Sequence, residues 1–109
     1  MGVTKTDLFT DRQNELAKIA KVFAHPARVA ILEYLIHSNS CINGDLVQQL
    51  GLAQATISQH LRELKEIGLI KGSIEGVSVN YCIDAVRWAE VQNLFQELFD
   101  GFPKISGCC

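Results

Sequence analysis

The chain has 109 residues, which suits one domain over residues 1–109 with a modest core that dimerisation would enlarge. It lacks both an apolar run long enough to span a membrane and a signal-peptide pattern, so we expect a cytoplasmic protein with no membrane contact. We expect no enzyme either, because no Ser/His/Asp grouping and no phosphate-binding glycine loop is visible.

The first predicted helix lies near the N-terminus and carries an apolar stripe. A capping box from Thr10 to Gln13 would start this helix. Its stripe either covers the core of the subunit or contacts a partner, and we favour the partner. The stripe consists of Leu16, Ile19, Ala20 and Phe23.

A second helix is predicted to begin at the step His25–Arg28. Pro26 suits the first helical position, because proline fixes φ and lacks an N–H that would need a partner. Arg28 is equally consistent with a surface ion pair and with a phosphate contact. His25 and His37 bracket this helix, and neither needs a ligand to explain it.

The segment Asn43–Ile70 predicts a short helix, a tight turn and a longer helix. Asn43 is a good N-cap, and Leu46, Val47 and Leu50 follow at helical spacing. Gly51 then supplies the left-handed residue that ends a helix without steric cost.

The longer helix has one apolar face and one polar face. Ile57, Leu61, Leu64 and Ile67 form its apolar stripe, and His60 at the edge of that stripe is expected to pack or bond internally. The polar face suits a helix that enters the major groove of DNA. The predicted DNA-contacting residues are Gln54, Thr56, Ser58, Gln59, Arg62, Lys65 and Lys71.

A β-hairpin is predicted after this helix. Ile70–Ile74 would be its first strand and Glu75–Gly76 its turn, and the alternation from Val77 to Ile83 is typical of a half-buried second strand. The predicted fold is therefore mainly α with a small β-hairpin: a winged helix-turn-helix with five helices and a two-stranded wing. The wing tip carries Glu75 and no arginine. The sequence therefore favours neither contact nor lack of contact between the wing and DNA.

The last predicted helix has a second apolar stripe that includes two phenylalanines, Phe95 and Phe99. A two-fold dimer through both terminal helices would place two recognition helices about 34 Å apart, which predicts an imperfect palindrome in double-stranded DNA. The predicted dimerisation residues are Leu16, Ile19, Phe23, Val91, Leu94, Phe95 and Leu98.

These motifs resemble the ArsR-type (ArsR/SmtB) family of winged helix-turn-helix repressors over nearly the whole chain. The resemblance rests on AKVFAHPARVAILEYLI (Ala20–Ile36) and LGLAQATISQHLRELKEIGLI (Leu50–Ile70). It implies a homodimeric repressor that an effector releases from DNA. Relatives usually begin the recognition helix with serine and proline, whereas this chain has Ala53 and Ala55, which predicts a looser helix start.

The cysteines raise the question of an effector. Many relatives have a Cys-x-Cys pair where this chain has Ile42 and Gly44, and the last helix has no histidine for the other common metal site. Cys41 and the tail residues Cys108 and Cys109 remain as thiolate ligands for As(III), Cd(II), Zn(II) or Pb(II) as inducer, with no cofactor required for DNA binding. Residues 101–109 would form a flexible tail that reaches Cys41, and Cys82 would be a bystander.

Three alternatives stay open. The cysteines could sense redox state, or they could be incidental in a repressor that needs no effector. A net charge of −2 at pH 7 also keeps a winged-helix protein-interaction module without DNA binding under consideration, since nonspecific nucleic-acid binders are basic. Local charge favours DNA, because the cations lie ahead of the acidic C-terminal helix. They are Lys18, Lys21, Arg28, Arg62, Lys65 and Lys71.

Overall fold

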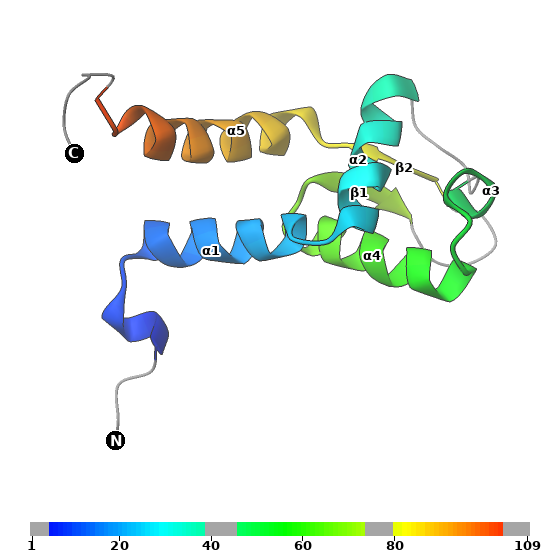
Figure 1. Ribbon diagram of the computed structural model, residues 1–109, viewed down its shortest axis with the longest axis horizontal. Coiled ribbons are helices and arrows are strands. Elements are labelled where there is room, and N and C mark those ends of the chain that lie inside the picture. The colour runs from blue at the N-terminus through cyan, green and yellow to red at the C-terminus, as the bar shows by residue number, and fades with distance from the viewer. Residues whose placement is uncertain (1–4, 39–45, 74–79, 104–109) are drawn as a thin grey trace.

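The computed structural model describes residues 5–38, 46–73 and 80–103 (Figure 1). The fold class is confirmed as mainly helical, with five α-helices and a two-stranded antiparallel sheet among the described residues. None of the helices in these ranges is long and apolar enough to cross a membrane. The elements in chain order are the 3-10 helix η1 (Lys5–Leu8), α1 (Asp11–Phe23), α2 (Pro26–Ser38), α3 (Leu46–Leu50), α4 (Gln54–Glu66), β1 (Ile70–Ser73), β2 (Asn80–Ile83) and α5 (Ala85–Asp100).

The predicted start signals of the first two helices are confirmed. The Thr10 hydroxyl accepts a hydrogen bond from the backbone N–H of Gln13 at 3.0 Å, and the Gln13 side chain accepts one from the backbone N–H of Thr10 at 2.9 Å. This reciprocal capping box satisfies two N–H groups that a helix start otherwise leaves without partners. Helix α2 begins at Pro26, as expected from its fixed φ.

The turn between α3 and α4 forms at Gly51. This residue has φ 70°, a left-handed conformation that glycine adopts at little cost, and its N–H donates to the carbonyl of Val47 at 2.9 Å. Helix α4 then starts after Ala53, whose side chain makes no capping hydrogen bond. The predicted N-cap of α3, Asn43, lies outside the described residues.

The hairpin pairs β1 with β2 in antiparallel register, from Ile70 opposite Ile83 to Ser73 opposite Asn80. Gly72 has φ 116°, and a Cβ atom there would collide with the backbone carbonyl oxygen of Asn80 across the ladder, so the strand pair requires glycine at this position. The predicted extension of the first strand to Ile74 and the predicted turn at Glu75–Gly76 fall outside the described residues.

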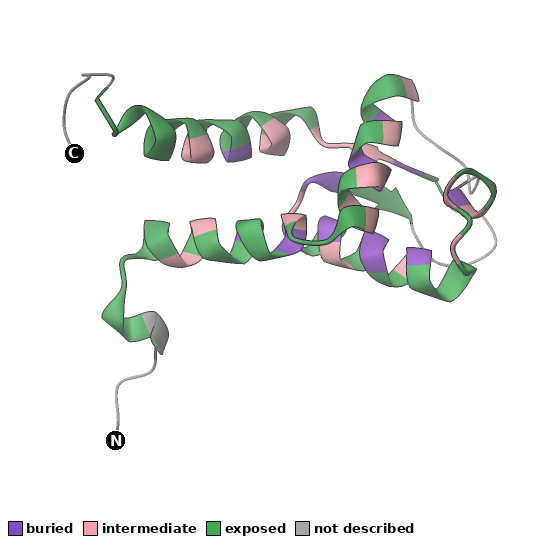
Figure 2. Cartoon of the chain, in the orientation of Figure 1, coloured by how far each residue is buried: buried purple, intermediate pink, exposed green. Residues whose placement is uncertain are grey.

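The core lies where α2, α4 and the hairpin meet (Figure 2). The apolar stripe of α4 points into it, with Ile57, Leu61 and Leu64 at most 2% exposed. Tyr81 of β2 is 1% exposed and packs in the same cluster. The predicted apolar stripe is therefore the buried, inner face of α4.

Helices α1 and α5 run antiparallel beside each other and extend away from this core as an arm (Figure 1). The Cα radius of gyration is 17.0 Å, against roughly 13 Å for a compact domain of this length. The arm therefore has much of its surface outside the core of its own subunit.

We predict that Ala53→Ser stabilises the protein by about 1 kcal/mol, because a serine at the N-cap accepts a hydrogen bond from the first turn of the helix. Ala53 already has the extended conformation of an N-cap residue, with φ −63° and ψ 147°. Chemical denaturation of both proteins measures the difference. Ala55→Ser, one helical position beyond the first, is the matched control and should give no gain; equal effects of the two variants would contradict the capping argument.

Candidate DNA interface

The polar face of α4 is exposed along most of its length. Gln54, Thr56, Gln59, Arg62 and Lys65 are all exposed, and Figure 2 shows the N-terminal end of α4 as exposed surface at the edge of the molecule. Ser58 is half-buried, and Lys71 is exposed on β1. The structure thus brings the predicted DNA-contacting residues to one helix face and the strand that follows it.

Side chains on this face are joined by hydrogen bonds one helical turn apart. Gln54 Nε2 donates to Ser58 Oγ at 3.2 Å, and Arg62 Nη1 donates to Gln59 Oε1 at 3.4 Å. Gln59 Nε2 donates in turn to Glu63 Oε1 at 3.1 Å. These contacts hold the Gln59 amide and the Arg62 guanidinium beside each other before any ligand is bound.

Lys65 links the end of α4 to the hairpin. Its Nζ donates to the carbonyl oxygen of Gly72 at 2.7 Å, which joins the helix to β1. Because an ammonium group has three donors, Lys65 can hold this contact and still reach a phosphate.

His60 is buried, as predicted, and its partner is Arg28. Arg28 Nε donates to His60 Nδ1 at 3.1 Å, and Arg28 Nη1 donates to the carbonyl oxygen of Val22 at 3.4 Å. The sequence predicts either a surface ion pair or a phosphate contact for Arg28. Instead, this half-buried side chain ties α2 and the end of α1 to α4. Its partner lies 32 residues away, so no local pattern could indicate the contact.

The two lysines predicted on the first helix share a cavity with carboxylates of α4. Lys18 and Lys21 line a cavity of about 560 Å³ together with Glu63 and Glu66 of α4. The cations that lie ahead of the C-terminal helix in the sequence therefore do not form one surface. Some line this cavity, and others lie on the outward surface around Arg62.

Known proteins share this sequence and this fold. A sequence model described as "Bacterial regulatory protein, arsR family" matches residues 25–71, which run from the start of α2 into β1. The uncharacterized HTH-type transcriptional regulator MJ1325 of Methanocaldococcus jannaschii is 34% identical over 88 residues, covering 81% of this chain and 99% of the relative. The chain belongs to the arsR family.

Two further relatives extend the likeness beyond the helix-turn-helix. The biofilm growth-associated repressor of Xylella fastidiosa is 29% identical over 97 residues, covering 89% of this chain and 83% of the relative. The crystal structure of the transcriptional repressor BigR from Xylella fastidiosa has a TM-score of 0.59 at 27% identity, with 94% of this chain and 100% of that chain covered. The crystal structure of Rv0081 of Mycobacterium tuberculosis has a TM-score of 0.63 at 28% identity, with 84% and 91% covered.

As a member of the arsR family, the protein is a DNA-binding transcriptional regulator and not an enzyme, as the sequence predicted. The alternative of a winged-helix module without DNA binding is not supported, because the relatives with assigned roles are named as regulators or repressors. The polar face of α4 is accordingly the candidate DNA interface of this arsR-family protein.

The predicted effector cysteines Cys41, Cys108 and Cys109 all lie outside the described residues. Cys82 is half-buried on β2. Within residues 5–38, 46–73 and 80–103, no three His, Cys, Asp or Glu side chains are grouped so that they could hold a metal ion.

The predicted dimerisation residues divide into buried, half-buried and exposed side chains. Ile19 and Val91 are buried within the subunit at 1% and 4% exposed, so they belong to its own core. Leu16, Phe23, Leu94 and Phe95 are half-buried, and the rings of Phe23 and Phe95 meet edge to face with centroids 6.2 Å apart. Leu98 is 55% exposed.

Other apolar residues on the arm are exposed although they are not among the predicted dimerisation residues. Near the start of α1, Leu8 and Phe9 are exposed, and Phe102 just beyond α5 is 77% exposed. Phe99 belongs to the apolar stripe of the last helix but not to the predicted dimerisation residues, and it is 67% exposed. Their signal was simply a large apolar side chain next to a helix end, which is too common in proteins to be specific.

We predict that stability falls as pH drops below about 6.5 and that His60 contributes to this loss. Burial, assisted by the nearby charges of His25 and Arg28, lowers the pKa of His60. Between this lowered pKa and the value in the unfolded chain, only the unfolded chain binds the proton, so a falling pH favours unfolding. Protonation at Nδ1 also removes the acceptor that Arg28 uses.

The measurement is the difference in Tm between pH 7.5 and pH 5.5. His60→Gln should make this difference smaller, while the control His37→Gln, at an exposed position, should leave it unchanged. An equal drop in wild type and His60→Gln would contradict the role of His60.

Proposed function

We propose that this arsR-family protein is a homodimeric repressor in which the outward face of α4 reads the major groove of an imperfect palindrome. One observation carries the proposal: Gln59 and Arg62 are exposed side by side on a helix whose opposite face is fully buried. A helix held in this way can enter the groove as a rigid unit. A cytoplasmic location is part of the proposal, because the protein must reach DNA to act.

The residues of this face have chemistry suited to different parts of DNA. The amide of Gln59 and the guanidinium of Arg62 can each form paired hydrogen bonds with base edges, with adenine and guanine respectively. Ser58 is the third residue proposed to face the bases. Gln54 and Thr56 lie in the first turn of α4, where N–H groups and the helix dipole favour a phosphate. Lys65 and Lys71 are proposed as phosphate contacts near the hairpin.

Dimerisation is proposed through the arm formed by α1 and α5. Leu98 and Phe99 are 55% and 67% exposed, and further apolar side chains flank them at the arm's end. A monomer that exposed such an apolar surface would be expected to associate. Two-fold pairing also supports DNA affinity in a protein with a net charge of −2. Each subunit can make only a few phosphate contacts, and a dimer makes two sets of them.

Release from DNA is proposed to depend on thiols. Cys41, Cys108 and Cys109 are the proposed ligands for As(III), Cd(II), Zn(II) or Pb(II) as inducer, since thiolates bind such ions strongly. An inducer would act only by binding the DNA-incompetent conformation more tightly. Oxidation of the same thiols is the alternative signal.

We predict that the double variant Gln59→Ala/Arg62→Ala loses operator affinity by at least about 100-fold, because each base contact contributes about 1–3 kcal/mol and the dimer has two copies. Fluorescence anisotropy with duplex DNA from upstream of the protein's own gene measures the affinity. Sedimentation velocity should find a dimer for wild type and variant alike, and Tm should change little because both side chains are exposed.

The matched control is Arg12→Ala/Gln96→Ala, which removes the same residue types from the arm. Arg12 pairs with Glu97 and Gln96 bonds Asp100, far along the chain from α4. This control should bind the operator as wild type does. Retained affinity in the α4 variant would overturn the assignment of the recognition face, and a monomeric wild type would overturn the dimer.

We also predict that replacing Cys41, Cys108 and Cys109 together by serine abolishes the response to inducer and leaves DNA binding intact. The thiolates bind the ion, whereas serine hydroxyls remain protonated and bind soft ions poorly. The operator-binding assay is repeated with arsenite, Cd(II), Zn(II), Pb(II) and an oxidant such as diamide.

Cys82→Ser is the matched control and should respond as wild type does. Release by metal ions alone would support the thiolate site, and release by diamide alone would support redox sensing. If the triple variant still leaves DNA in response to either signal, the proposed role of the three thiols is wrong.

A further inference from the structure

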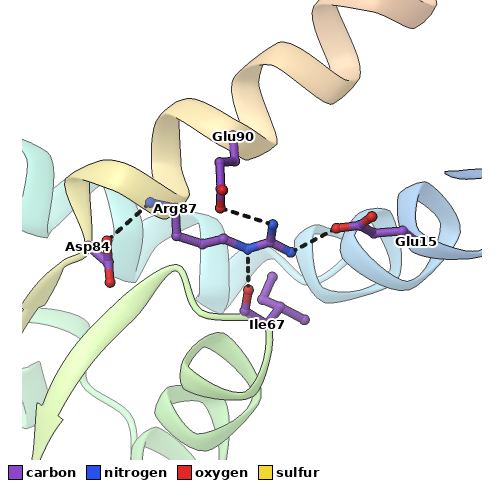
Figure 3. Close-up of polar contacts among 5 residues, drawn as sticks. All are labelled: Glu15, Ile67, Asp84, Arg87 and Glu90. Carbon is purple, nitrogen blue, oxygen red and sulfur yellow. Dashed lines mark hydrogen bonds and ion pairs between the residues drawn. The ribbon is translucent and has the colours of Figure 1, made fainter.

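Arg87 joins three separate parts of the molecule (Figure 3). Its Nε donates to the carbonyl oxygen of Ile67 at 2.9 Å, its Nη2 pairs with Glu15 at 3.2 Å, and its Nη1 pairs with Glu90 at 3.4 Å. Its backbone N–H donates to the Asp84 carboxylate at 3.1 Å, in the N-cap of α5. One guanidinium therefore connects α5, α1 and the end of the recognition helix.

The contact with Ile67 lies at the C-terminal end of α4, where the chain turns towards β1. Ile67 is the C-cap residue of α4 and is only 6% exposed. The next residue, Gly68, lies against the stem of Arg87: a Cβ atom there would be 3.1 Å from Arg87 Cγ. The arginine stem thus packs against the turn after α4 while its head bonds the helix end.

The arm reaches the core of α4 through the buried residues Ile19 and Val91 and through α2, on which both α1 and α4 pack, and Arg87 adds a direct polar link between the arm and the end of α4. Helix α4 packs mainly on α2, α3 and β1, whereas α5 packs on α1. The Arg87 side chain is 25% exposed, so its contacts are partly shielded from water. A planar guanidinium spreads its N–H donors over three nitrogens and can reach three separate acceptors in a fixed geometry. The donors of lysine all lie on one nitrogen, so they cannot span the same three acceptors.

We propose that Arg87 is a positioning residue for operator recognition, which fixes the orientation of α4 relative to the arm formed by α1 and α5. The inference rests on the proposed dimer, in which the arm joins the two subunits. The arm's connection to each α4 then sets the separation and angle of the two recognition helices. Arg87 acts through Ile67 and α4 and has no part in the outward face.

The spacing of the two half-sites distinguishes positioning from simple stabilisation. One inserted base pair moves the half-sites apart by about 3.4 Å and rotates them by about 35°. Firmly oriented recognition helices fit one spacing well and discriminate against the others. Loosely held helices lose affinity for the native spacing but adapt to the altered ones.

The experiment uses the duplex that wild type protects in footprinting upstream of its own gene, together with two versions that have one base pair inserted or deleted at the centre. Binding constants are measured for wild type, Arg87→Met and Arg87→Lys. Arg87→Met keeps the apolar stem over Gly68 and removes every donor of the head. The control Arg12→Met removes the Arg12–Glu97 pair, which joins α1 to α5 at 3.2 Å without touching α4.

We expect Arg87→Met to reduce the preference for native spacing by about 3- to 30-fold, the range typical of residues that couple distant sites. Arg87→Lys should restore part of the preference through its single ammonium. Arg12→Met should retain the wild-type preference. Sedimentation velocity checks that each variant is dimeric at the concentrations used.

An unchanged spacing preference in Arg87→Met, or an equal loss of affinity for all three duplexes, would overturn the inference. If Arg87→Met does not fold, Glu15→Ala takes its place, because Glu15 is an exposed acceptor whose loss removes the link to α1 alone. In that case, a wild-type spacing preference in Glu15→Ala would overturn the positioning role of Arg87. Absence of operator binding by wild type is a different result, since it would overturn the proposed function itself.

Discussion

The candidate DNA interface depends on the burial of one face of α4. Ile57, Leu61 and Leu64 are at most 2% exposed, and they anchor the helix in the core between α2 and the hairpin. Burial of an aliphatic side chain of this size contributes about 1.5–3 kcal/mol. Because the polar residues on the opposite face contribute little to the core, they can vary to suit a DNA sequence without loss of the fold.

Three cationic side chains supplement this apolar anchor from different directions. Arg28 bonds His60 from α2, Lys65 joins the helix to Gly72, and Arg87 bonds the carbonyl of Ile67. A hydrogen bond from a charged group contributes about 1.5–3 kcal/mol, a range that suits the part-buried contacts of Arg28 and Arg87. Exposed charged contacts, such as the ion pair Arg12–Glu97, contribute about 0–1 kcal/mol. The orientation of α4 therefore rests on packing and on polar contacts that are part-buried at Arg28 and Arg87 and exposed at Lys65.

The arm formed by α1 and α5 has the opposite character. Its inner residues, Ile19 and Val91, complete the core, while Leu98 and Phe99 face outward. The same apolar periodicity thus serves two purposes along one helix. Leu98 lies about two turns beyond Val91 on nearly the same face of α5, so the distance along the helix from the core, not the helix face, separates the buried residue from the exposed one.

Local patterns in the sequence determined the helix-turn-helix, because its signals lie within a few residues of the structures they produce. The left-handed turn at Gly51, the apolar stripe of α4 and the uncapped start at Ala53 all follow from spacing and residue type, as does the set of outward-facing polar residues. Only the tertiary structure decided what Arg28 and Arg87 do. Arg87 meets Glu15 across 72 positions of sequence, and an arginine that bonds a distant carbonyl leaves no periodicity by which it could be found. Periodicity records which face of a helix is buried, whereas long-range polar contacts depend on how the helices come together.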